Sequence, residues 1–146
     1  MAVELTIRND LAAAHGAAWR WLASAGTWWS ARERVALAAT ARKAMWSAVV
    51  PPPWALEGEI AAFVGDGVGD ASPGAHLAAV RMACHPATIT ARWHRTVADA
   101  LGELAYVELV AIVCVTAAVT SLRRGLGLEI PAQPDVADAP ATRAEA

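Results

Sequence analysis

The stretch Val97–Thr116, VADALGELAYVELVAIVCVT, decides the fold because its pattern also occurs in Leu22–Ala41, LASAGTWWSARERVALAATA. When the two are aligned, Glu33 falls on Glu108, and Ala, Val and Leu or Ile positions match around them. In both stretches an amphipathic helix, a helix break and a more apolar helix follow one another. A shared order of this kind indicates an internal duplication.

We place the two halves at about residues 10–50 and 86–125, within one all-α domain that spans residues 1–131. Helix start and stop signals support this, above all the capping-box pattern from Ser30 to Glu33 and the Ser72-Pro73 start. No segment alternates at period two for long enough to form a sheet. The expected helices cover residues 10–25, 31–50, 54–64, 74–84, 87–101 and 103–125. Residues 132–146 lack periodicity and are expected to form a disordered tail.

Composition excludes several classes of function. Charged residues make up 18% of the chain and the net charge is -2, without a long basic run, so nucleic acid is not an expected partner. The apolar stretch 104–120 is short for a membrane span and contains Glu108, so we expect a buried core helix. Two cysteines and the absence of an apolar leader favour the cytoplasm. The low charge also suggests a homo-oligomer that covers part of the surface.

Three segments, GTWWSARERVALAA, ARWHRTVADALGELAYVELVAIV and RRGLGLEIP, resemble the alkylhydroperoxidase D-like and carboxymuconolactone decarboxylase-like superfamily. The nearest type is the actinobacterial alkylhydroperoxidase-related one. The resemblance covers residues 5–131 and is weakest at 45–74. It implies an all-helical fold of duplicated halves and assembly as a dimer, trimer or hexamer.

Peroxidases of that superfamily combine a glutamate, a Cys-x-x-Cys pair and a histidine. Glu108 matches the glutamate, but Thr120 and Arg123 stand near the cysteine positions, and residues 45–50 hold no cysteine. Without a second thiol, a sulfenic acid could not be resolved as a disulfide. The sequence therefore predicts a cofactor-free acid/base enzyme acting on a small organic substrate. The alternatives are a non-catalytic binding or assembly protein, and a residual thiol peroxidase.

Two glutamates and one histidine are the acid/base candidates. Glu33 has a structural explanation as part of the capping box. Glu108 has none, because an ionised carboxylate inside an apolar helix needs a partner. We expect His94 to lie near it, since the helix that carries His94 directly precedes that of Glu108. The basic residues considered as ion-pair partners are Arg92, Arg95 and Arg123.

The remaining candidates are thiols and aromatic side chains. Cys84, next to His85, is the candidate thiol, whereas Cys114 is expected to be buried and unreactive. The spacing of the histidines and cysteines fits no metal motif, and no cofactor is expected. An aromatic pocket for an organic ligand and ordinary packing both remain open for the aromatic residues. The candidate pocket residues are Trp28, Trp29, Trp93 and Tyr106.

Overall fold

The computed structural model describes residues 6–55, 71–136 and 140–142. Within these ranges the chain forms α-helices and one short 3₁₀ helix, and no strand, so the predicted all-α class is confirmed. The predicted helix at 54–64 lies almost wholly outside the described residues. The elements are α1 (Asn9–Leu22), α2 (Ala31–Met45), α4 (Pro73–Cys84), η2 (Pro86–Thr88), α5 (Ala91–Leu101) and α6 (Glu103–Gly125).

The capping signals form as predicted at two helix starts. At α2, Ser30 Oγ accepts from the Glu33 N–H at 3.2 Å, and Glu33 Oε2 accepts from the Ser30 N–H at 2.8 Å. At α4, Ser72 Oγ accepts from the Ala75 N–H, with Pro73 as the first helical residue. Both caps satisfy backbone donors that the helix itself cannot pair.

Three boundaries differ from the predictions. The second helix ends at Met45 rather than at residue 50, with Trp46 as its C-cap. The first helix ends at Leu22 rather than just before Gly26, because the following residues form a loop that leads into α2. The fifth helix begins at Ala91 rather than 87, because Pro86–Thr88 winds as a 3₁₀ turn and Thr90 caps the Trp93 N–H. A proline at the start of a short turn and a threonine cap explain the later start.

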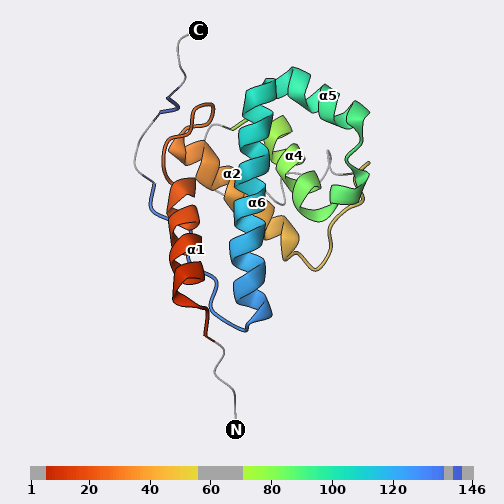
Figure 1. The fold of residues 1–146 in the computed structure, drawn as a ribbon. Helices are drawn as coiled ribbons and strands as arrows, with labels where there is room; N and C mark the ends of the chain where they lie inside the picture. Colours follow the sequence, from red (N-terminus) through yellow and green to blue (C-terminus); the bar gives the residue numbers. More distant parts are fainter. Residues whose placement is uncertain (1–5, 56–70, 137–139, 143–146) are drawn as a thin grey trace.

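Helix α6 stands in front of the bundle, with α1 on one side, α4 on the other and α2 behind it, while α5 crosses one end (Figure 1). It packs against α1, α2, α4 and α5. The main core lies where these helices meet and is filled mostly by small and branched side chains together with two tryptophans. Its fully buried members include Leu22, Leu37, Ala38, Ala41, Ala75, Ala79, Leu109 and Ile112.

Among the described helices, α6 is the one that is long and apolar enough to cross a membrane. Its 23 residues meet the length criterion, and 44% of its most apolar window is buried within the protein. The central helix of a soluble bundle has the same properties, and α6 has four helices packed against it.

After α6 the chain turns back and runs beside α1 (Figure 1). Trp19 Nε1 donates to the Ala132 carbonyl at 2.8 Å, and Arg42 donates to the Pro131 carbonyl at 3.1 Å. Further on, the backbone N–H of Thr142 donates to the Gly26 carbonyl at 2.8 Å. The described parts of the tail are therefore non-helical but bonded to the amino-terminal half.

Candidate functional site

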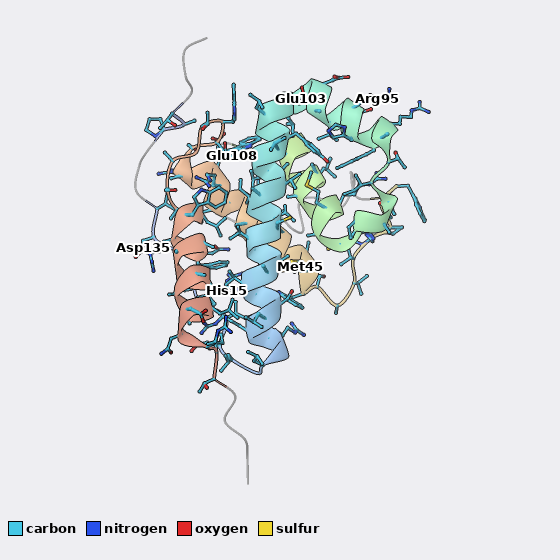
Figure 2. The ribbon with its side chains drawn as sticks, viewed as in Figure 1. His15, Met45, Arg95, Glu103, Glu108 and Asp135 are labelled. Carbon is cyan, nitrogen blue, oxygen red and sulfur yellow. The ribbon has the colours of Figure 1, made fainter. Side chains whose placement is uncertain are left out.

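Glu108 is the acid/base candidate that the structure places in an unusual environment. Its Oε2 accepts a hydrogen bond from the Trp28 N–H at 2.9 Å, and its Oε1 lies 3.5 Å from Arg34 Nε. The Arg34 side chain is 1% exposed and that of Glu108 is 12% exposed. Figure 2 shows Glu108 on the side of α6 that faces the loop between α1 and α2. The carboxylate therefore joins α6 to α2 and to that loop.

Arg34 is held from several directions. Its Nη1 donates to the Ser24 carbonyl at 2.8 Å, and the guanidinium carbon lies 3.5 Å from the centre of the Trp21 ring. Burial lowers the pKa of Arg34, and the negative charge of Glu108 acts in the opposite direction. Desolvation of a guanidinium is costly, so its charged partner and the aromatic face both help to keep it inside the protein.

The loop at residues 23–30 closes tightly over the carboxylate. A Cβ atom on Gly26 would overlap Oε1 of Glu108, so no larger residue fits without a shift of the loop. The Gly26 N–H donates to the Trp29 carbonyl, and Trp29 Nε1 donates to the Ala105 carbonyl, each at 2.9 Å. The loop is thus fixed both to itself and to α6.

A small pocket of about 280 Å³ opens beside the ion pair. Oε1 of Glu108 and both Nε and Nη2 of Arg34 are buried and have no hydrogen-bond partner among the described residues. These atoms retain bonding capacity, but Oε1 lies under Gly26 and is not open to the pocket. The pocket is lined by Trp21, Ala25, Gly26, Thr27, Arg34, Glu108 and Thr142.

Glu33 and Glu108, which align with each other in the sequence, make different kinds of contact. Glu33 Oε2 accepts from both the N–H and the Oγ of Ser30 at 2.8 Å, close to the first residue of α2. Glu108 lies well inside α6, which begins at Glu103, and its partners come from elsewhere in the chain. Glu33 is therefore a helix-capping residue, as expected, whereas Glu108 makes tertiary contacts.

His94 does not pair with Glu108 in this structure. Its ring packs edge-on against Tyr106, with ring centres 4.7 Å apart. The basic residues named from the sequence are elsewhere too: Arg123 donates to the Glu129 carbonyl, and Arg95 lies on the outer part of α5 (Figure 2). Among the described residues no ion pair joins Glu108 to any of the predicted partners His94, Arg92, Arg95 and Arg123, so that prediction is wrong. The partner of Glu108 is Arg34.

Arg34 is the site residue that sequence reasoning missed, although a signal for it exists. It shares a helix face with Leu37, Ala38 and Ala41, all of which are buried. A single charge within an apolar helix face indicates a buried ion pair, in the same way that Glu108 did within α6.

The four aromatic candidates do not line one pocket. Trp29 is buried in the core, and Trp28 borders a pocket of about 320 Å³ beside residues 101–105. Tyr106 is buried under Trp93 and His94, and burial raises the pKa of its hydroxyl. Trp93 alone faces a third, largely apolar pocket.

This third pocket lies between α4 and α5 and has a volume of about 280 Å³. The Arg81 guanidinium lies 5.0 Å from the centre of the Trp93 ring and donates to Thr88 Oγ1 at 3.1 Å and to the Thr88 carbonyl at 2.9 Å. Apolar side chains form most of the wall. The lining residues are Pro53, Gly74, Leu77, Ala78, Arg81, Trp93, Thr96, Val97, Ala100 and Leu101.

Both cysteines are free thiols, and one is placed differently from the expectation. Cys84 is half-buried, and burial raises the pKa of its thiol. Cys114 is exposed, not buried, because it lies on the face of α6 that no described helix covers. Within the described ranges, no three His, Cys, Asp or Glu side chains are grouped so that they could hold a metal ion.

Comparison with known proteins gives no relative: no protein-family model, curated protein or solved structure matches the chain.

Proposed function

We propose that this chain is a non-catalytic binding protein on an alkylhydroperoxidase D-like helical scaffold, and that it takes a small, largely apolar molecule between α4 and α5. The observation that carries the proposal is the pocket itself, which has a wall of apolar side chains and a tryptophan. Its volume is close to the lower end of known ligand sites, about 300 Å³. The proposal includes a cytoplasmic location, since both cysteines are free thiols.

The pocket has the composition that ligand sites share. Trp93 supplies a flat apolar surface, and Leu77 and Val97 supply aliphatic walls. Arg81 stands at the same pocket with its guanidinium held by Thr88, so its position is fixed before a ligand arrives. A preorganised cation beside an apolar wall favours a small aromatic or aliphatic molecule with one anionic or carbonyl group.

The surroundings of Glu108 argue against catalysis as the first choice. A general base needs its oxygen within hydrogen-bonding reach of a substrate. One oxygen of Glu108 is bonded to Trp28, and the other is buried beneath Gly26. Thr120, near the position of a family thiol, donates its hydroxyl to the Thr116 carbonyl inside α6. These groups support the helical scaffold.

Binding can be tested by NMR titration with 1-naphthoate as the probe. We expect saturable shifts of the methyl signals of Leu77, Val97 and Leu101, which line the pocket. The variant Ala100→Trp should block the pocket, whereas Ala91→Trp places the same side chain at an exposed position at the start of α5. Equal binding by both variants, or no saturation in the wild type, would refute the proposal.

A second candidate is cofactor-free acid/base catalysis by Glu108. It is favoured by three polar atoms of the Glu108–Arg34 pair that have no hydrogen-bond partner among the described residues, beside a pocket that Thr142 helps to line. In such a site Glu108 would remove a proton next to a carbonyl group, and Arg34 would stabilise the resulting oxyanion. Deuterium exchange from solvent into small ketones, lost in Glu108→Gln, would support this function over simple binding.

A further inference from the structure

Helix α6 carries a row of side chains that no other described segment covers. We call this row the α6 stripe: Leu104, Val107, Ala111, Cys114, Ala118 and Ser121. Leu104 and Val107 are each 58% exposed, Cys114, Ala118 and Ser121 are also exposed, and Ala111 is half-buried. Figure 1 shows this helix in front of the other helices, so its outer face is open.

The spacing of the stripe alternates between three and four residues along the whole helix. This is the a/d spacing with which one helix packs against another helix over several turns. Towards the middle the stripe consists of Ala111, Cys114 and Ala118, whose small side chains allow two helix axes to approach to about 8 Å. A surface with this period fits a second helix better than a flat or irregular partner.

Charged residues at the two ends of the stripe indicate that the partner helix is a second copy of α6. Glu103 and Arg124 are both exposed, and neither forms an ion pair within the described chain. The Arg124 guanidinium lies 4.2 Å from the centre of the Trp46 ring, so it would leave this ring to meet a partner's carboxylate. Glu103 and Arg124 lie three heptads apart and therefore flank the stripe on the same side. If a second copy of α6 lies antiparallel, each Glu103 meets the partner's Arg124, whereas a parallel pair would not bring these opposite charges together.

We propose that two copies of this chain associate through the α6 stripe as an antiparallel helix pair, with Cys114 near the two-fold axis. A helix of 23 residues is about 34 Å long. Pairing over this length buries on the order of 1,000 Å² in total, which is at the low end of specific interfaces. The association is therefore expected to be reversible. Antiparallel packing also sets the helix dipoles against each other favourably.

The first test is sedimentation equilibrium of the full chain over a range of concentrations. The wild type should populate a dimer, and Val107→Arg should raise the dissociation constant at least about tenfold. Val49→Arg is the matched control, since Val49 is 78% exposed and lies outside the stripe. A wild type that stays monomeric at all concentrations, or a dimer indifferent to Val107→Arg in a folded variant, would overturn the proposal.

A charge exchange tests the antiparallel direction. Glu103→Arg alone should weaken the dimer, and adding Arg124→Glu should restore it, because the opposite charges again face each other. Circular dichroism would confirm that each variant is folded. Failure of the second change to restore association would exclude the proposed direction.

Disulfide trapping gives an independent reading of the same geometry. In a background of Cys84→Ala and Cys114→Ala, the variants Leu104→Cys and Ser121→Cys should form a mixed disulfide when combined under oxidising conditions. Each variant alone should stay monomeric on a non-reducing gel, since its new thiol would be far from that of its partner. Disulfide dimers of either variant alone would indicate a parallel pair and contradict the proposal.

Discussion

Arg34 Nε lies 3.5 Å from Oε1 of Glu108, and this ion pair connects α2 to α6 with almost no access to solvent. The same two side chains hold the loop at residues 23–30, through the Ser24 carbonyl and the Trp28 N–H. The pair is therefore a fixed point on which three segments of the chain depend.

Removing the charge of Glu108 should destabilise the fold. In Glu108→Gln the Arg34 guanidinium remains buried without a counter-ion, and we expect a loss of about 3 kcal/mol in the free energy of unfolding. Urea denaturation measures this loss. Asp99→Asn is the control, since Asp99 is exposed on α5 and belongs to neither the ion pair nor the α6 stripe. A loss for Glu108→Gln no larger than that of the control would show that the ion pair contributes little.

Gly26 should tolerate no side chain. Gly26→Ala forces a methyl group against Glu108 Oε1, and the strained packing should cost about 2 kcal/mol. Gly16→Ala is the matched change, because its Cβ meets only the flexible end of Arg20 at 3.4 Å in the middle of α1. That variant should gain up to about 1 kcal/mol, since alanine favours a helix. Thermal melts measure the stability of both variants relative to the wild type. A Gly26→Ala variant as stable as the wild type would contradict the close packing of Gly26 on Glu108.

Buried His76 should make the protein sensitive to acid. Its Nδ1 lies 2.8 Å from Thr40 Oγ1, its Nε2 has no partner among the described residues, and burial lowers the pKa of the ring below 6.5. As the pH falls through about 6.5, the unfolded chain takes up a proton that the folded protein resists. Stability should therefore fall below that pH and be at its full value above it.

The measurement is the free energy of unfolding at a series of pH values between neutrality and mild acid. His76→Gln should flatten the decline, whereas His94→Gln, which leaves His76 intact, should retain it. An equally steep decline in His76→Gln would assign the acid sensitivity to other groups.

The two thiols should react at different rates. Cys114 is exposed, while Cys84 is half-buried with its pKa raised by burial, so iodoacetamide should modify Cys114 first. Mass spectrometry of the intact protein and its peptides measures this order. Protection of Cys114 at high protein concentration would accompany pairing through the α6 stripe. Faster modification of Cys84, together with hydroperoxide turnover lost in Cys84→Ser, would support the residual thiol function instead.

The sequence predicted the local features of the fold well. The capping box at Ser30 and Glu33, the Ser72-Pro73 start and the extent of α6 from Glu103 to Gly125 are confirmed. Each depends on residues close together in the chain, where the rules of capping and helix breaking apply directly. The duplication itself remains a prediction.

The tertiary partners could not be predicted in the same way. Arg34 meets Glu108 only because α2 and α6 pack together, and Cys114 is exposed only because the other helices cover the opposite face of α6. An apolar sequence indicates that a helix is largely buried. When nearly every residue is apolar, however, the sequence does not show which face of the helix remains exposed. The order of the helices likewise predicts only that α5 packs near α6, and not that His94 contacts Tyr106 rather than Glu108.

The bond from the Trp28 N–H to Glu108 spans 80 residues, and the bond from Thr142 Oγ1 to the Gly26 carbonyl spans 116. Such contacts form late in folding, because segments far apart in the chain must first be synthesised and brought together. During synthesis α1 and α2 leave the ribosome long before Glu108 is available, so Arg34 stays hydrated until α6 emerges. The amino-terminal helices therefore complete their packing only after the carboxyl-terminal ones are made, whatever the evolutionary origin of the two halves.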